Sequence, residues 1–215
     1  MLQIDIWSDI VCPFCYIGKR RLEVALAQFE HCDQVHIEWH SYQLDPEVES
    51  HTGETIYEYL ARRKGITDEQ SEQMHEHVTS MAASVGLDYR FDIAKVANSF
   101  DAHRLIHFSK RSNLADDMEE ALFHAYFSEG EDIAKHATLV KLASGVGLDA
   151  AEANEVLNSE KFAAEVRRDI DVASQLGIGG VPFFVFGLQY AVSGAQSPHV
   201  FESALARAWE TLAPK

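Results

Sequence analysis

Two different periods of apolar residues alternate along the first forty positions of the chain. Apolar side chains fall on every second position in residues 2–6, which predicts a short strand. Residues 13–30 then show helical spacing, and residues 35–40 return to alternation, which predicts a second strand. Because a strand–helix–strand unit normally joins parallel neighbours of one sheet, we expect these two strands to be parallel.

The middle of the chain, residues 55–176, keeps helical spacing and shows no convincing strand pattern. Thr67 and Gln70 have the spacing of a capping box, and Gly86 is placed to end the helix that this box begins. Another helix is expected to open near Ser159 and to end at Gly177. The apolar stripes predicted for the helices are Met74, Val78, Met81 and Val85; Leu105 and Phe108; Leu122 and Tyr126; Leu139, Leu142 and Ala143; and Phe162, Val166, Ile170 and Ala173.

The last part of the chain returns to strands. Residues 181–186 and 189–193, separated by two residues, predict a β-hairpin, and residues 198–212 predict a final helix. The order βαβ, several helices, ββα indicates an α/β fold with a helical insertion packed against its sheet. The predicted domains are residues 1–50 with 177–215, and an all-helical insertion of residues 51–176.

The composition is that of a globular protein, with 47% hydrophobic and 24% charged residues among 215. The formal charge of −16 comes from 34 acidic and 18 basic residues spread along the chain. Nucleic acids and anionic membrane surfaces attract clustered Lys and Arg, so neither is an expected partner. The negative charge itself indicates solubility rather than a particular ligand.

The N-terminus lacks the basic start and unbroken apolar run of a signal peptide, so we expect a cytoplasmic location. No segment approaches the roughly 20 apolar residues of a membrane-spanning helix. The chain contains three cysteines, Cys12, Cys15 and Cys32. An odd number in a reducing compartment argues against a structural disulfide framework, so any disulfide here is expected to be transient and chemical.

Cys12 and Cys15 form a Cys-Pro-Phe-Cys motif at the predicted junction between strand and helix. The unpaired N–H groups and positive dipole end of the helix stabilise a thiolate at Cys12, the form that attacks disulfides. Cys15, one turn into the helix, is expected to be more buried and less ionised. Cys12 is therefore predicted to attack and Cys15 to resolve the mixed disulfide, while Pro13 suits the first helical turn.

Other readings of the cysteines are a zinc half-site or inert buried thiols. Zinc needs two further ligands, and the chain has no second Cys-x-x-Cys. The closest histidine pairs, such as His103 with His107, are explained as helix-face residues. We therefore predict no metal site and no cofactor other than a redox-active disulfide. Cys32 is expected to be a partly buried small apolar residue.

The Val181-Pro182 dipeptide follows a glycine pair at the start of a predicted strand. Proline is tolerated at such a position in either peptide isomer, and the local sequence leaves both open. A cis peptide bond would expose the N–H and C=O of Val181. These groups could then pair with an extended substrate peptide.

The element order, the Cys-Pro-Phe-Cys motif and the Gly-Val-Pro segment together resemble the thioredoxin-fold superfamily, specifically the DsbA family with its helical insertion. Residues 8–18, 98–105 and 194–196 resemble the FrnE-like branch of that family. The resemblance implies protein disulfide oxidoreductase activity, peptide or protein thiols and disulfides as partners, and a cis peptide bond before Pro182. The substrate-binding residues that it implies are Pro13, Phe14, Val181, Pro182, Asn98 and His103. For the last two, a capped helix start is an alternative reading.

Kappa-class glutathione transferases and 2-hydroxychromene-2-carboxylate isomerases are similar to the same branch. They carry Ser-Pro-Tyr-Ser at the motif and an acidic residue near position 196, where this chain has two cysteines and Gln196. A glutathione-dependent transferase or isomerase is therefore the second hypothesis, with glutathione as a candidate co-substrate. A redox-sensing binding module is the third. Because Phe14 has no hydrogen-bond donor for the Cys12 thiolate, we predict a reduction potential between those of strongly reducing and strongly oxidising relatives.

Overall fold

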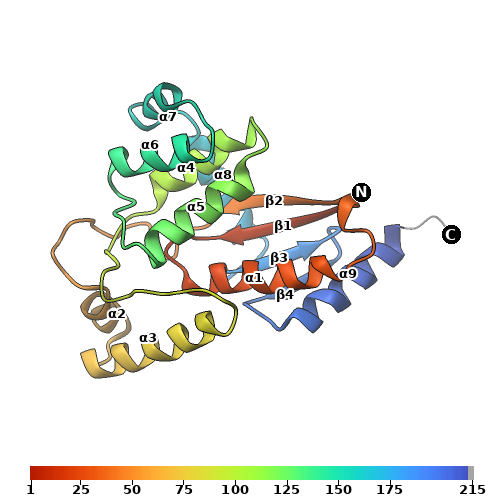
Figure 1. The fold of residues 1–215 in the computed structure, drawn as a ribbon, viewed down its shortest axis with the longest axis horizontal. Helices are drawn as coiled ribbons and strands as arrows, with labels where there is room; N and C mark the ends of the chain where they lie inside the picture. Colours follow the sequence, from red (N-terminus) through yellow and green to blue (C-terminus); the bar gives the residue numbers. More distant parts are fainter. Residues whose placement is uncertain (213–215) are drawn as a thin grey trace. The chain divides into compact units, whose positions relative to one another are not determined.

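The computed structural model describes residues 1–212 (Figure 1). Residues 213–215, the end of the predicted C-terminal segment, lie outside the described residues. Contacts divide the chain into two compact units. The first unit contains residues 1–44 and the chain from residue 166 onward, and the second contains residues 45–165.

The first unit is built on a sheet of four strands in the described part of the chain, in the order β2-β1-β3-β4. β1 pairs in parallel with β2 and antiparallel with β3, and β3 pairs antiparallel with β4. The strands are β1 (Leu2–Ser8), β2 (Val35–Ser41), β3 (Phe183–Phe186) and β4 (Tyr190–Ser193). The predicted α/β fold class, with βαβ and ββα parts, is confirmed. Gly187 and Leu188, both at positive φ, form the hairpin turn.

One face of this sheet forms the main core with two helices, α1 (Pro13–Ala27) and α9 (Pro198–Leu212), which contact each other (Figure 1). Because side chains alternate along a strand, residues 2, 4 and 6 of β1 point to the same side. Phe201 of α9 packs edge-on against Phe184 of β3, with ring centroids 4.8 Å apart. The fully buried large side chains of this layer include Leu2, Ile4, Ile6, Phe184, Phe186 and Phe201.

The other face of the sheet is covered by α8 (Ala163–Gln175). This helix belongs to the first unit from residue 166 onward. Ala173 packs with Trp7 and Ile178, and the indole N–H of Trp7 donates to the carbonyl of Asp169 at 3.2 Å. These contacts explain why the second segment of the first unit begins at residue 166. The sequence pattern had predicted that this segment begins at residue 177. Phe162, expected in the apolar stripe of this helix, lies before it with φ of 64°.

The second unit consists of helices joined by loops. They are α2 (Ile56–Lys64), α3 (Asp68–Ala83), α4 (Phe100–Lys110), α5 (Ala115–Phe127), α6 (His136–Gly145) and α7 (Ala150–Leu157). The capping box of Thr67 and Gln70 is present at the start of α3. The predicted stripe of α3 was wrong at Met74, which is exposed, because the buried face includes His75 and Ser71, whose polar groups hydrogen-bond to backbone carbonyls.

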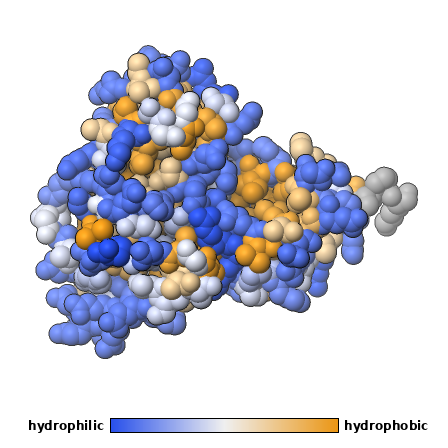
Figure 2. Space-filling model, viewed as in Figure 1, coloured by the Kyte–Doolittle hydropathy of each residue, from blue (hydrophilic) through white to orange (hydrophobic). Residues whose placement is uncertain are grey.

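Hydrophilic residues predominate on the face shown in Figure 2, as the negative formal charge suggests. Among residues 1–212, no helix is both long enough and apolar enough to cross a membrane.

Candidate redox site

The Cys-Pro-Phe-Cys motif lies where β1 gives way to α1. Cys12 is the N-cap of α1, with φ −91° and ψ 110°, and Pro13 occupies the first turn. The N–H of Cys12 donates to the carbonyl of Asp9 at 2.9 Å, and the N–H of Cys15 donates to the carbonyl of Cys12 at 3.0 Å. The strand end and the helix start thus place Cys12 at the positive end of the helix, as the sequence predicted.

The loop before β3 lies against this motif. The Cys12 thiol donates to the carbonyl of Val181 at 3.4 Å, and the Val181–Pro182 peptide bond is cis. Gly18 of α1 allows the close approach, because a Cβ built there would lie 3.0 Å from Pro182 Cγ. The carbonyl of Pro182 accepts the N–H of Gly194 at 2.8 Å, so this loop is also tied to β4.

Both motif cysteines are free thiols and both are buried, Cys12 at 3% exposure and Cys15 at 1%. Cys15 is the more buried, as expected, but Cys12 is more covered than its attacking role suggested. Burial, and then the neighbouring Cys12, raise the pKa of the Cys15 thiol well above its usual value. Hydrogen bonding from the Asp9 backbone, and then from the Ser8 side chain, acts in the opposite direction.

Four of the predicted substrate-binding residues surround the thiols within the first unit. Phe14 is 38% exposed, Pro13 and Val181 are half-buried, and Pro182 is buried. Phe14 is thus the most exposed of the four and Pro182 the most buried, and their role toward a substrate stays a prediction.

Asp9 is a buried carboxylate that the sequence reasoning passed over. Its Oδ2 accepts the N–H of Leu44 at 2.7 Å, and its Oδ1 accepts the N–H of Val11 at 3.5 Å. Asp9 therefore ties the loop before Cys12 to the segment after β2. An aspartate that bonds to the backbone two residues onward is a recognisable turn signal, and this signal could have identified it.

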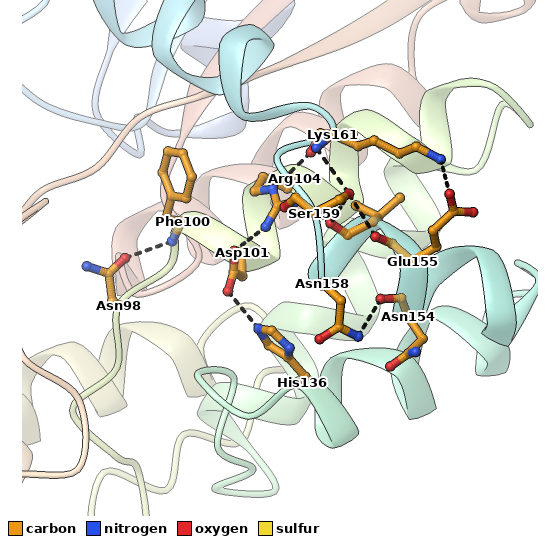
Figure 3. A network of polar contacts seen from close by, with 11 residues as sticks. Asn98, Phe100, Asp101, Arg104, His136, Asn154, Glu155, Asn158, Ser159 and Lys161 are labelled. Atoms are coloured by element: carbon orange, nitrogen blue, oxygen red, sulfur yellow. Dashed lines mark hydrogen bonds and ion pairs between the residues drawn. The ribbon is translucent and has the colours of Figure 1, made fainter.

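The predicted site residues Asn98 and His103 belong to the second unit. The Asn98 side chain accepts the N–H of Phe100 at 3.0 Å and donates to the carbonyl of Pro46 at 3.1 Å, while His103 is completely buried in α4. These contacts agree with the reading of a helix start (Figure 3). Their role toward a substrate stays a prediction.

Arg104, next to His103, is the centre of a buried network (Figure 3). Its guanidinium donates to Asp101 Oδ1 at 2.7 Å and to the Lys161 carbonyl at 2.9 Å, and also to the carbonyls of Val156 and Ser159. The last helical turn of α7 leaves carbonyls without intrahelical partners. Arg104 therefore anchors the end of α7 and the loop that follows it.

The prediction for Cys32 was wrong, because this residue is exposed. The helix α1 ends at Ala27, before the predicted end near Glu30, and Cys32 opens a short 3₁₀ turn (Cys32–Gln34) on the surface. Within the described range 1–212, no group of three His, Cys, Asp or Glu side chains could hold a metal ion.

Comparisons with known proteins place this architecture in a family. The model of the family described as DSBA-like thioredoxin domain matches residues 3–206. A crystal structure of a probable DsbA oxidoreductase from Streptomyces coelicolor is 38% identical, with a TM-score of 0.94, covering 100% of this chain and 93% of that one.

Other known proteins match nearly the whole chain. An uncharacterized Bacillus subtilis protein, YwbO, is 28% identical over 95% of this chain and 96% of its own. The cytosolic disulfide reductase DsbM from Pseudomonas aeruginosa, crystallised with GSH, has a TM-score of 0.67 at 17% identity, covering 97% of this chain and 99% of that one. On the family match and the Streptomyces coelicolor structure, the chain belongs to the DSBA-like thioredoxin domain family.

Proposed function

We propose that this protein is a disulfide oxidoreductase that exchanges disulfides with peptide or protein thiols through Cys12 and Cys15. Thiol–disulfide oxidoreductase chemistry is supported by the family fold and by the related DsbA oxidoreductase. The observation that carries the proposal is the placement of Cys12. Its free sulfur lies at the N-terminus of α1 and donates a hydrogen bond to the Val181 carbonyl. The buried Cys15 thiol follows one helical turn later.

The chemistry follows from the different surroundings of the two sulfurs. The Cys12 thiolate attacks one sulfur of a substrate disulfide, forms a mixed disulfide and releases the other substrate sulfur as a thiolate. Cys15 then attacks the Cys12 sulfur, so that the Cys12–Cys15 disulfide forms and the second substrate thiol leaves with the proton from Cys15. The enzyme is oxidised by two electrons and the substrate is reduced; the reverse sequence oxidises a substrate dithiol.

The substrate is expected to lie along the loop that contains Val181. The half-buried backbone of Val181 adjoins Cys12 and precedes β3, where an extended peptide can add main-chain hydrogen bonds. The exposed ring of Phe14, within the motif itself, offers an apolar contact as well. Both features favour an unfolded or extended polypeptide over a compact small molecule.

Insulin reduction with a dithiol reductant tests the proposal. Cys12→Ser is expected to lose the activity entirely, because the attacking sulfur is gone. Cys32→Ser is the matched control, since it removes an exposed thiol outside the motif and should retain the native rate. Reduction that persists in Cys12→Ser would show that the motif is not the reactive centre. Negligible turnover in the native chain, with partner affinity that depends on oxidation, would instead favour a redox-sensing module.

We also propose glutathione as a co-substrate that recycles the motif, which fits the cytoplasmic location expected above. The related DsbM was crystallised with GSH. In this chain the Gln196 amide donates to the Ser193 carbonyl at 2.9 Å, and this position carries no carboxylate to hold a glutathione amino group. Saturable glutathione binding with conjugation or isomerisation that survives Cys15→Ser would favour the transferase or isomerase hypothesis instead. Calorimetry at millimolar glutathione measures the binding directly.

A further inference from the structure

The loop that follows α3 carries two aromatic side chains on alternate positions. Tyr89 and Phe91 are buried, whereas Arg90 and Asp92 are exposed. The ring of Tyr89 stacks on Phe127 of α5, with centroids 4.5 Å apart and planes at 21°. Because this stack ties the loop to a buried helix face, both aromatic rings are held in fixed positions within the second unit.

These two rings line a pocket of about 510 Å³ together with side chains of α2 and α3. Tyr57 of α2 meets His75 of α3 at 4.9 Å between ring centroids, with planes at 79°. His75 in turn meets Phe91 at 4.5 Å and 72°, and Phe91 meets Tyr89 at 5.5 Å and 79°. Four rings in different planes around one space suit an ammonium group, which is attracted to aromatic faces. The volume lies in the range of small-molecule sites, roughly 300–1,000 Å³.

The polar groups of the pocket are mostly acceptors of hydrogen bonds. The Nδ1–H of His75 donates to the Ser71 carbonyl at 2.8 Å, and burial lowers the pKa of the imidazole. The neutral ring therefore keeps Nε2 as an acceptor. The Thr79 hydroxyl donates to the His75 carbonyl at 2.9 Å, and the Ser80 hydroxyl donates to the carbonyl of Glu76 at 3.0 Å. With these protons engaged, the remaining lone pairs suit a ligand that carries N–H donors.

The charge around the pocket is negative. Glu76 and Asp92 line it, and among the described residues that do so none is Lys or Arg. Asp92 is paired with Arg90 through hydrogen bonds of 2.8 and 2.9 Å, but Glu76 forms no ion pair within residues 1–212. Burial, and then the charges of Asp92, Glu72 and Glu76, raise the pKa of the Tyr57 phenol. A cation that enters the pocket therefore meets a favourable potential.

We propose that this pocket binds a primary alkylammonium ion, supplied by a free amine or by a lysine side chain. The rings of Tyr57, His75, Tyr89 and Phe91 attract the charge and pack against the alkyl chain. Nε2 of His75 and the carboxylate of Glu76 match its N–H donors. The site lies in the second unit and uses neither motif cysteine, so it is independent of the proposed function.

NMR spectroscopy of the ¹⁵N-labelled full chain at low ionic strength tests the proposal, with n-butylammonium chloride as the probe. Saturable shifts are expected for the amide signals of residues 75–80 and 89–92. The neutral analogue n-butanol should give no saturable shift, and tetramethylammonium, which lacks N–H donors, should bind more weakly. Tighter binding of Nα-acetyl-lysine amide than of n-butylammonium would assign lysine side chains as the source, and the reverse order would assign free amines.

Substitutions locate the site. Tyr57→Leu and Glu76→Gln should each weaken n-butylammonium binding by about threefold, the effect of one exposed cation–π contact or one surface ion pair. Tyr57→Phe keeps the ring, and Glu210→Gln removes an exposed carboxylate from α9, so both should bind like the native chain. Glu76 is exposed, so its variant tests the site even where Tyr57→Leu perturbs α2.

Three results would overturn the proposal. The first is the absence of saturable shifts with n-butylammonium in the native chain. The second is equal binding of n-butylammonium and n-butanol, which would show that the pocket takes apolar groups without regard to charge. The third is undiminished binding by both Tyr57→Leu and Glu76→Gln, which would place the cation elsewhere.

Discussion

The cluster of Asp5, His40 and Asp169 in the first unit gives a stability prediction that can be worked out from its contacts. His40 Nε2 lies 2.9 Å from Asp5 Oδ1, and His40 Nδ1 lies 3.3 Å from Asp169 Oδ1. The imidazole also stacks on Trp7, with ring centroids 4.5 Å apart. The substitution His40→Phe keeps a ring in the stack but removes both nitrogens, and it leaves the two carboxylates without this partner.

The magnitude follows from what remains around Asp5. Burial acts to raise the pKa of the Asp5 carboxyl, but hydrogen bonds from His40 and Gln3 and the charge of His40 hold it below its usual value. After His40→Phe, Asp5 keeps the Gln3 amide at 2.7 Å. Asp5 Oδ2 has no hydrogen-bond partner within residues 1–212 even in the native chain. Leaving a buried polar group without its hydrogen-bond partner costs about 1–3 kcal/mol, and more for a charged group, so we expect about 3 kcal/mol for the two carboxylates that lose His40.

The loss should depend on pH in a defined direction. The folded-state pKa of Asp5 lies below its unfolded value, so its stabilising contribution is complete above about pH 4 and is lost as pH falls through the folded-state pKa. The part of the difference in unfolding free energy that comes from Asp5 is therefore expected to be fully present above about pH 4. The difference between the native chain and His40→Phe should shrink as the pH falls below that value.

Urea denaturation followed by tryptophan fluorescence measures this difference, because Trp7, Trp39 and Trp209 all belong to the first unit. With a urea dependence of about 2–3 kcal/mol/M, a loss of about 3 kcal/mol lowers the midpoint by about 1–1.5 M. His36→Phe makes the same change at a 52% exposed side chain of the same strand, and should stay within about 0.5 kcal/mol of the native chain. Equal midpoints for the two variants at neutral pH would refute the reasoning.

Three other predictions test the packing and the chemistry. Gly18→Ala should slow disulfide exchange in the insulin assay, because the new methyl meets Pro182 at 3.0 Å; Gly145→Ala, with no described atom within 4 Å, should not slow it. Arg104→Met should destabilise the second unit by about 3 kcal/mol, because buried carbonyls lose a charged hydrogen-bond donor. Denaturation followed by circular dichroism measures this loss, and the control Lys161→Met should cost under about 1 kcal/mol. Equilibration of the redox pair with glutathione should give a potential between about −270 and −120 mV, and a value near −120 mV would contradict the reading of Phe14.

The sequence predicted the elements around the redox site well because apolar spacing dominates them. The alternation in residues 2–6 and in the hairpin reflects a sheet whose side chains face alternate layers, and helix α9 matches the predicted residues 198–212. The position of Cys12 at the N-terminus of a helix followed from the same reasoning, since Pro13 fits only the first turn.

The parts that the sequence did not predict are polar groups buried by distant partners. Asp5 and His40 are 35 residues apart in the sequence, and His40 and Asp169 are 129 residues apart. Alternation alone assigns Asp5 and His40 to solvent. In α3, His75 and Ser71 take buried positions because their polar groups bond to carbonyls one turn away or on α2, which displaces Met74 to the surface. A pattern of apolar positions carries no information on such pairings.

Intact-protein mass spectrometry of the Cys15→Ser variant tests the central claim most directly. The reduced variant is incubated with a peptide disulfide, quenched with acid and digested to locate the adduct. We predict one peptide adduct per chain that resists resolution, maps to Cys12 and is released by dithiothreitol, in a Cys32→Ser background that excludes the exposed thiol. Absence of an adduct at Cys12, with the fold intact, would contradict the assignment of Cys12 as the attacking thiol.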